Sequence, residues 1–360
     1  MKLTVPEYFH RFKCIAGDCR DSCCVGWEID IDEKTLEKFN TLPGIEGEEL
    51  RASINYDGDT PCFYTSGNRC VHLRDDGLCE LICRHGEEIL SDICREHPRY
   101  YTTLGEVTYG GVGMTCEAAC ELILTERDGH RYTTTDAEDA EYGECDEELS
   151  DDVMRLHSEL VSILAERGRP LADRLFEVIT RTATLAGRID ERDYSALIGR
   201  AGKRSDDLPR EASDATVDRI APCSDGCLSV IFDLLSSLEY MGDDLPTLYE
   251  SIKSVSDGGC VANFKEYEPY LTNSALYFLD RYMPVAAADG DLLGTLALTL
   301  ISVFILSHAF SRTDGTLTEL VDAAKTWSSE VEYCEENVDE IRASAEDILP
   351  TLIFLILNAK

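Results

Sequence analysis

The sequence has few basic residues: its 360 residues include 33 lysines and arginines against 70 aspartates and glutamates, a formal net charge of −37. Nucleic-acid binding needs a basic patch or stripe that neutralises phosphates, so we expect no DNA or RNA partner. A solvated acidic surface keeps a protein soluble, as in salt-tolerant organisms, and this is the interpretation we favour. The alternative is that the charge attracts a basic substrate segment, such as a loop that carries lysines.

The sequence also lacks the long apolar runs that target or anchor a chain. Residues 1–14 contain no apolar segment of the kind found in secretory signals. The apolar stretch 292–310 is interrupted by Thr295, Thr299 and Ser302, and its unbroken parts are shorter than the ~20 residues of a membrane span. We therefore expect a cytoplasmic protein without a membrane span, in which a reducing environment disfavours disulfides.

Two cofactor motifs are missing as well. Paired CxxC knuckles, the usual sign of a zinc ribbon, do not occur, and their absence mildly favours iron–sulfur over zinc. No GxGxxG follows a strand pattern, so a Rossmann-type nucleotide site is not supported. The glycine-rich segment 110–113 would let a backbone approach a nucleotide or a cluster closely, but a turn is the simpler interpretation.

What the sequence does have is cysteine, sixteen in all, most of them between residues 14 and 120. Cys14, Cys19 and Cys23 lie close enough in sequence for one loop to offer three ligands, and thiolates select zinc or iron–sulfur clusters. Cys24, next to Cys23, points in a divergent direction and serves another site or is buried. Iron–sulfur is our first interpretation, zinc the second and isolated structural thiols the third.

Several segments resemble the flagellin lysine-N-methylase family. The first is Phe12 to Ile15 with Cys23-Cys24-Val25-Gly26-Trp27 and the acidic alternation up to Asp32. The second runs from Cys70 to Cys79 and from Gly86 to Arg99, and the third begins at Thr115-Cys116. A fourth, weaker one comprises Asn263-Phe264, Glu268 to Leu271 and Leu279 to Tyr282.

The resemblance implies a cytoplasmic enzyme that moves methyl groups from S-adenosylmethionine to lysine ε-amines of flagellin or another lysine-bearing surface protein. It also implies an iron–sulfur cluster, most simply [4Fe-4S], in the cysteine-rich part. The candidate metal ligands that match the family pattern are Cys14, Cys19, Cys23, Cys24, Cys70, Cys79, Cys94 and Cys116. Catalytic and S-adenosylmethionine-binding residues are not identified. The rival interpretation is a non-catalytic iron–sulfur or zinc protein with a redox or structural role.

The chain departs from known patterns in three ways. Where the family has Cys-Pro-Phe-Leu, this chain has Cys70-Val71-His72-Leu73. The cysteines at 62, 83, 120 and 145 are additional to the family set. The CxxxCxxC spacing of radical S-adenosylmethionine enzymes is absent, so any cleavage of S-adenosylmethionine at a cluster would use an unfamiliar ligand arrangement.

Other residues near the thiols have both a functional and an ordinary interpretation. The histidines at 72, 85 and 97 would complete a mixed metal site or are simply hydrogen-bonded. Trp27 would shield a cluster, and Arg95 and Arg99 would neutralise an anionic group or lie on the surface. The tyrosines at 267, 270 and 277 would line a lysine-accepting cavity, or pack in a core at helical spacing.

The fold class we predict is mainly α. A cysteine-rich, metal-organised module of short strands and helices (1–125) is followed by a polar linker or hairpin (126–146) and an all-α domain (147–360). We expect a hairpin around Gly105, a strand at 28–32 and helices at 32–39, 116–125, 150–164, 171–185, 227–240 and 266–282. Residues 202–222 are a second polar link. Residues 292–310 predict a buried central helix, and 348–357 another with Pro350 in its first turn.

Overall fold

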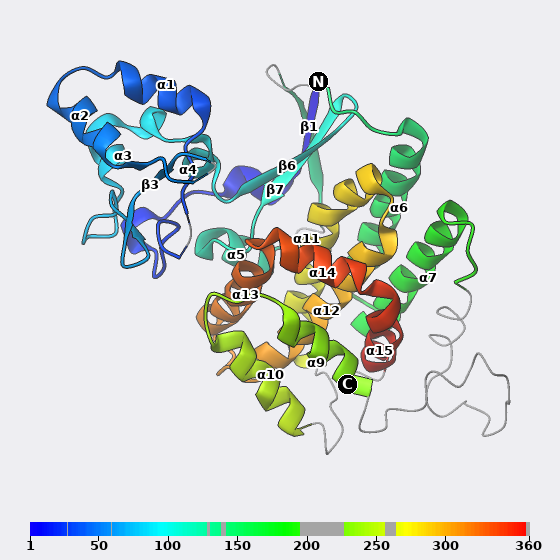
Figure 1. The fold of residues 1–360 in the computed structure, drawn as a ribbon. Helices are drawn as coiled ribbons and strands as arrows, with labels where there is room; N and C mark the ends of the chain where they lie inside the picture. Colours follow the sequence, from blue (N-terminus) through cyan, green and yellow to red (C-terminus); the bar gives the residue numbers. More distant parts are fainter. Residues whose placement is uncertain are drawn as a thin grey trace, which may run out of the picture.

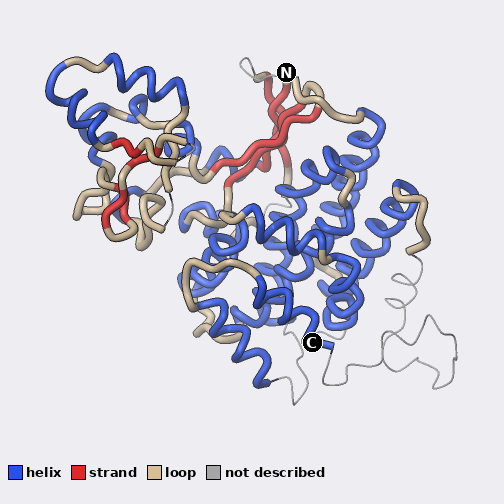
Figure 2. The backbone as a smooth tube through the Cα atoms, viewed as in Figure 1, coloured by secondary structure: helices blue, strands red, loops and turns tan. Residues whose placement is uncertain are grey.

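The computed structural model describes residues 1–26, 28–58, 60–127, 130–137, 142–194, 227–255 and 264–357. This part of the chain is mainly helical, with a few short strands near the N-terminus. Figures 1 and 2 show a small lobe beside a larger helical body, with a narrow sheet between them. The predicted polar link at 202–222 lies outside the described residues.

The small lobe is built around its own core of buried side chains, which extends from Ile29 to Leu90. Its helices are α1 (Glu33–Thr41), α2 (Gly44–Ala52), α3 (Glu80–His85) and α4 (Asp92–Glu96), and its two-residue strands are β2 (Ile54–Asn55), β3 (Cys62–Phe63), β4 (Thr65–Ser66) and β5 (Arg69–Cys70). The Asp32 carboxylate caps α1 by accepting from the Thr35 amide. A strand at 28–32 was predicted; Ile29 and Ile31 are buried, but only an isolated bridge at Asp30 forms there.

The sheet has four strands in the order β6-β7-β1-β8, with β1 at Lys2–Pro6, β6 at Arg99–Leu104, β7 at Val107–Val112 and β8 at Tyr132–Asp136. The hairpin predicted around Gly105 is confirmed: β6 and β7 are antiparallel, and Gly105 has a φ of +57°, which glycine adopts without steric cost. β8 lies within the segment 126–146, where we expected a linker or hairpin, and it pairs with β1.

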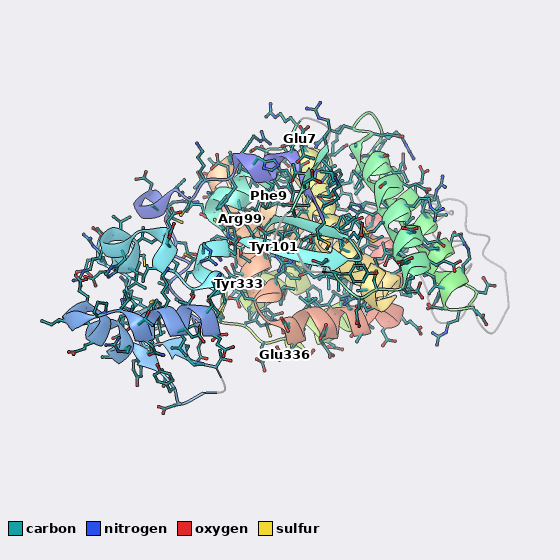
Figure 3. The ribbon with its side chains drawn as sticks, turned by 90° about the horizontal axis from the view of Figure 1, so that it is seen from above. Glu7, Phe9, Arg99, Tyr101, Tyr333 and Glu336 are labelled. Atoms are coloured by element: carbon teal, nitrogen blue, oxygen red, sulfur yellow. The ribbon has the colours of Figure 1, made fainter. Side chains whose placement is uncertain are left out.

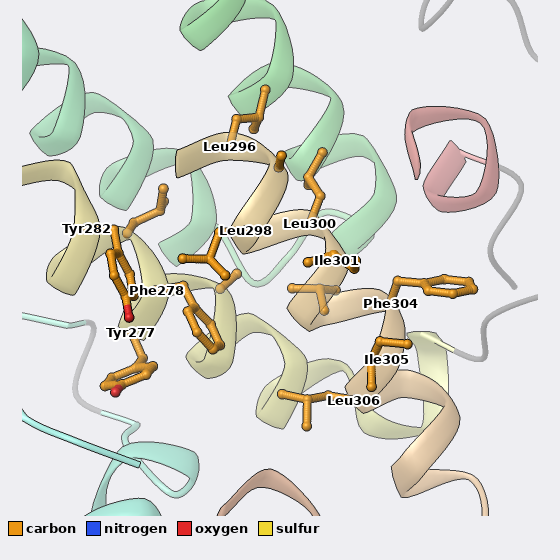
Figure 4. Packing of buried hydrophobic residues seen from close by; sticks show 14 of the residues in the cluster. Tyr277, Phe278, Tyr282, Leu296, Leu298, Leu300, Ile301, Phe304, Ile305 and Leu306 are labelled. Atoms are coloured by element: carbon orange, nitrogen blue, oxygen red, sulfur yellow. The ribbon is translucent and has the colours of Figure 1, made fainter. Parts of the chain in front are cut away.

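The helical body contains α5 (Glu117–Leu124), α6 (Glu147–Ala165), α7 (Leu171–Ile189), α9 (Cys227–Ser237), α10 (Asp244–Val255), α11 (Phe264–Asp289), α12 (Leu292–Phe310), α13 (Leu317–Glu332), α14 (Glu335–Ala343) and α15 (Ala345–Leu357). α12 is its centre, as predicted, since α7, α11, α13, α14 and α15 all pack against it. Figure 4 shows side chains of α11 (Phe278, Tyr282) and α12 (Leu298, Ile301) in this core.

α12 is long and apolar enough to cross a membrane, but 94% of its apolar window is buried inside the described structure, as in the core helix of a soluble protein. We predicted Pro350 in the first turn of the last helix, but α15 begins at Ala345, so Pro350 lies in its second turn. The predicted module 1–125 contributes to two cores: residues 29–90 form the small one, while Tyr8, Leu104 and Val112 belong to the large one.

Candidate functional site

Four of the predicted ligands come together at the edge of the small core. Cys70 is buried in that core, and Cys24, Cys79 and Cys94 are half-buried against it. In each pair of this group, one thiol, when charged, would raise the pKa of the other, in addition to the larger effect of burial. We call Cys24, Cys70, Cys79 and Cys94 the inner thiol group; they come from four separate segments of the small lobe.

Backbone hydrogen bonds fix these segments. The Cys70 amide donates to the Cys24 carbonyl at 2.8 Å, which joins the first two thiol-bearing segments. Leu73 forms a bridge with Cys79 and holds the third. The Asp32 carboxylate that caps α1 also accepts from the Asp92 amide at 2.8 Å, and this bond anchors the start of α4, which carries Cys94.

The inner group carries protonated thiols when nothing else neutralises it. Burial, followed by the proximity of the other three thiols, raises the pKa of Cys70 to about 12. Burial and two of its neighbours raise the pKa of Cys94 to about 11. The exception is Cys24: a hydrogen bond from Cys23 lowers the pKa of the Cys24 thiol to about 7. A metal is bound by thiolates rather than by thiols. The positive charge of the metal would therefore have to stabilise the deprotonated form of these cysteines.

The other four predicted ligands do not belong to the small core. Cys14, Cys19 and Cys23 share the loop after the 3₁₀ turn Glu7–Arg11, and Cys116 caps the N-terminus of α5. Besides larger effects such as burial, Cys14 contributes to the raised pKa of Cys23 and of Cys116, and Cys116 contributes to the raised pKa of Cys19. We call Cys14, Cys19, Cys23 and Cys116 the outer thiol group. The cysteines of both groups carry free thiols.

Within the described residues, no three His, Cys, Asp or Glu side chains adopt the geometry of a site for a single metal ion. A tetrahedral zinc ion with bonds of about 2.3 Å would need its four sulfur atoms gathered around one point. An iron–sulfur cluster spreads its thiolates over different iron atoms and so keeps them further apart.

Two of the three predicted histidines have contacts of their own. His72 is hydrogen-bonded to the Ser53 hydroxyl at 2.8 Å and stacks edge-on against Phe63. His97 is buried enough that the pKa of its imidazole falls to about 4, and its ring centroid lies 6.5 Å from that of Tyr333. A hydrogen bond accounts for the position of His72, and burial beside Tyr333 for that of His97. Trp27 lies outside the described residues.

The two arginines beside Cys94 have partners of their own. Arg95 pairs with Asp92 and lies 3.5 Å from Glu96. Arg99 lies over the rings of Phe9 and Phe12, with its guanidinium carbon 5.8 Å and 5.3 Å from their centroids. Figure 3 shows Arg99, Phe9 and Tyr101 together near the junction of the small lobe and the body. Arg95 therefore pairs within its own helix, α4, and Arg99 contacts two aromatic rings near the N-terminus.

The glycine-rich segment is a strand rather than a turn: Gly110 and Gly111 belong to β7. Tyrosine rings fill the space above them. A Cβ at Gly110 would lie 2.7 Å from the Tyr101 ring, and one at Gly111 would lie 2.3 Å from the Tyr100 hydroxyl. The two glycines accommodate aromatic side chains of β6, and they leave no room for a nucleotide.

Sequence reasoning missed a buried polar network on α11. The Asp280 carboxylate is hydrogen-bonded to the Nε2 atoms of His130 (2.5 Å) and His157 (2.9 Å) and accepts from the Tyr132 hydroxyl (2.5 Å). These groups come from distant segments, so no spacing rule reveals them. The only signal was that Asp280 lies in the fourth segment of the family resemblance, to which no role was attached.

The next residue on α11 forms a second network. Arg281 Nε lies 3.0 Å from the Glu332 carboxylate, which also accepts from the Tyr277 hydroxyl at 2.8 Å. Tyr277 is thus a buried hydrogen-bonding residue. Tyr267 and Tyr270 pack against Phe310, with ring centroids at 5.8 Å and 6.5 Å. Core packing, the second of our two interpretations, accounts for the tyrosines that we considered for a lysine cavity.

A shallow hollow of about 450 Å³ lies between α6 and α7. Its lining includes Arg155, Glu159, Glu177 and Arg181, and none of the predicted site residues. The site residues considered below therefore come from the thiol groups and from the two networks on α11, not from this hollow.

Comparison with known proteins gives partial matches. Over 134 residues, 35% of this chain, the sequence is 28% identical to Lysine-N-methylase of Salmonella typhimurium and 27% identical to Lysine-N-methylase of Salmonella choleraesuis. It is also 27% identical over 134 residues to Flagellar biosynthetic protein FliU of Salmonella muenchen, of which the match covers 79%. The match spans 33% of the length of the two Lysine-N-methylases. No family model and no solved structure matches the chain.

Proposed function

We propose that this chain, which is similar to two Lysine-N-methylases over about a third of its length, is itself a protein lysine N-methyltransferase. In this proposal it uses S-adenosylmethionine, acts in the cytoplasm and methylates flagellin or another lysine-bearing surface protein. The observation that carries the proposal is the similarity to Lysine-N-methylase over 134 residues. The name of the FliU relative supports a flagellar substrate.

The reaction requires a neutral lysine amine. Its nitrogen lone pair attacks the methyl carbon, the bond between carbon and the sulfonium sulfur breaks, and the electron pair stays on sulfur as a thioether. The ammonium form has no lone pair, so its proton must first pass to solvent or to a base. Desolvation at the site would lower the pKa of the amine and so favour its neutral form.

We assign an iron–sulfur cluster to the inner thiol group. Cys24, Cys70, Cys79 and Cys94 have the donor chemistry that such a cluster needs, and all four belong to the small core or pack against it. A bound cluster would supply a redox-active iron centre. The protein side chains position it: Cys70 anchors the site in the core, and the bond from Asp92 to Asp32 holds the segment of Cys94 in place.

The test uses protein purified without oxygen. Binding of S-adenosylmethionine is measured by calorimetry, and transfer of a radiolabelled methyl group is measured on flagellin and on flagellin with chemically blocked lysines. We expect binding, and label on the unblocked flagellin only. A cluster-loaded chain that neither binds S-adenosylmethionine nor transfers label would overturn the proposal and favour the non-catalytic metal protein.

A pair of variants links the activity to the cluster. Cys79→Ser removes an inner thiol, whereas Cys83→Ser changes an exposed thiol one turn later in α3. We expect Cys83→Ser to retain the iron content and the transfer rate of the wild type, and Cys79→Ser to lose both. Equal iron content in the two variants would remove the inner group from the proposal.

A further inference from the structure

We propose that a charged loop holds the small lobe closed on the helical body, and that the lobe swings away from the body when the ion pairs of this loop are broken. The loop comprises residues 14–23, between the 3₁₀ turn Glu7–Arg11 and Cys24 of the inner thiol group, and we call it the ionic strap. The movement requires neither methyl transfer nor a bound metal, so it is independent of the proposed function.

The lobe and the body are packed as separate units. Each has its own buried core. Within the described residues, none of α1 to α4 and β2 to β5 packs extensively on a helix of the body, and Figure 1 shows the lobe beside it. The chain enters the lobe through the strap and leaves it where α4 leads into β6. Units without a large apolar interface usually move relative to each other.

One end of the strap contacts the lobe. A Cβ at Gly17 would lie 3.2 Å from the Asp76 carbonyl oxygen and 3.4 Å from the Leu78 side chain. A Cβ at Gly77 would lie 3.7 Å from the Gly17 Cα. The strap therefore rests closely on the turn that precedes α3, and this turn belongs to the lobe.

The other end of the strap is paired with the body. Arg20 lies 2.7 Å from the Glu117 carboxylate of α5 and 2.6 Å from the Asp322 carboxylate of α13. The Arg20 amide also donates to Glu117, at 2.9 Å. Asp21 pairs with Lys325 of α13. The strap thus joins the lobe to two helices of the body through charged side chains.

These pairs form a network in which two members are largely covered. The side chains of Glu117 and Lys325 are 12% and 15% exposed, whereas those of Arg20 and Asp21 are about half exposed. Isolated surface ion pairs contribute little to stability, but pairs that form a network contribute more. Partly buried pairs are also screened less by salt.

The remaining charges oppose closure. Acidic side chains outnumber basic ones in residues 28–94 and also in the rest of the chain. Two units with the same sign of net charge repel each other when they are close. The opposite charges of the strap counteract this repulsion, so breaking them leaves a net force that drives the lobe outward.

Opening would change the surroundings of the inner thiol group. That group belongs to the small core and moves with the lobe, whereas Tyr333, at the end of α13, stays with the body. The rings of His97 and Tyr333, now 6.5 Å apart, lie where the two units meet. The strap therefore sets how far the inner thiols lie from α13.

The experiment measures energy transfer between two dyes in anaerobically purified full-length protein. The dyes are attached to an azide-bearing amino acid at Ile45 of α2 and at Glu340 of α14, both exposed, so that the native cysteines are left unlabelled. The buffer contains about 0.05 M salt, where the screening length exceeds the ~10 Å of 0.1 M salt.

The variants exchange the charges of one pair. They are Asp21→Lys, Lys325→Asp and the combination of the two, which places a lysine opposite an aspartate again. The control is Arg84→Gln, which removes ion pairs within the lobe, to Glu80 and Glu49.

We expect each single variant to have a lower transfer efficiency than the wild type, because like charges then face each other across the strap. The combined variant should return to the efficiency of the wild type, and the control should not differ from it. Single variants with the efficiency of the wild type would overturn the proposal. A combined variant as low as the single ones would overturn it as well, because the loss would then not depend on the pairing of opposite charges.

A milder variant covers the case in which a charge reversal does not fold. Circular dichroism and urea unfolding identify such a variant. Arg20→Gln then replaces it, since the Arg20 side chain is 44% exposed and its loss removes the pairs to both Glu117 and Asp322. A folded Arg20→Gln variant should have a lower transfer efficiency than the wild type, and an unchanged efficiency would overturn the proposal.

Discussion

Tyr100 and Gly111 face each other across the β6–β7 ladder, and a Cβ at Gly111 would lie 2.3 Å from the Tyr100 hydroxyl oxygen. The ring of Tyr100 also lies under Arg281, whose guanidinium carbon is 4.9 Å from the ring centroid. The glycine is therefore required by close packing between the sheet and α11 rather than by a turn.

Gly111→Ala should destabilise the protein by about 1–3 kcal/mol, the usual cost of inserting a methyl group into a packed position. The measurement is the midpoint of urea unfolding. Gly168→Ala is the control, since a Cβ there meets nothing within 4 Å. Equal midpoints for the two variants would show that the Tyr100 ring moves aside freely and that the contact does not constrain the fold.

Asp280→Asn should destabilise the protein by about 3 kcal/mol, because it removes the negative charge of a buried carboxylate from its hydrogen-bonded partners. The Asp280 carboxylate is buried and hydrogen-bonded to His130, His157 and Tyr132, which join β8 and α6 to α11. Urea unfolding at neutral pH measures the effect, and Asp339→Asn, at an exposed position of α14, is the control. A variant as stable as the control would mean that neutral hydrogen bonds suffice in this network.

The same carboxylate predicts a dependence of stability on pH. Burial opposes its charge, but His130 and His157 outweigh burial and lower the pKa of Asp280 well below its usual range. A carboxyl with a lowered native pKa stabilises the fold above its unfolded pKa of about 3.9, and this stabilisation is lost as the pH falls further. The difference in unfolding free energy between wild type and Asp280→Asn should therefore shrink by about 1.4 kcal/mol per pH unit below pH 4. A difference independent of pH between 6 and 3 would contradict the assignment.

Local sequence signals predicted much of the fold. The hairpin at Gly105, the helix at 32–39 and the buried helix 292–310 were predicted from turn residues, apolar periodicity and apolar length, and all three are confirmed. The alternation at 28–32 correctly predicted burial, but the segment forms a single bridge, from Asp30 to Cys62, rather than a strand. The start of α15 was predicted at 348 instead of Ala345, because apolar periodicity does not determine where a helix begins.

The candidate site, like the fold, was predictable from the sequence only in part. The cysteines stand out in the sequence because they are frequent and closely spaced, but their division into two groups depends on which loops meet, as in the contact of Cys19 with Glu117. The networks around Asp280 and Glu332 join residues more than a hundred and about fifty positions apart, respectively. Such pairs leave no local pattern, so only the three-dimensional structure reveals them.

Removal of metal should affect the small lobe before the helical body. The lobe has a core of its own that is much smaller than that of the body, and four of its segments meet at the inner thiols. Small cores of this size usually need a metal or another cross-link to stay folded. We therefore expect chelator-treated protein to be cleaved first between residues 28 and 94 in limited proteolysis, while α11 and α12 stay intact. Mass spectrometry of the fragments gives the cleavage sites, and untreated holoprotein is the control. Cleavage that begins in the body, or the same pattern with and without chelator, would show that the thiols of the lobe contribute no stabilising cross-link.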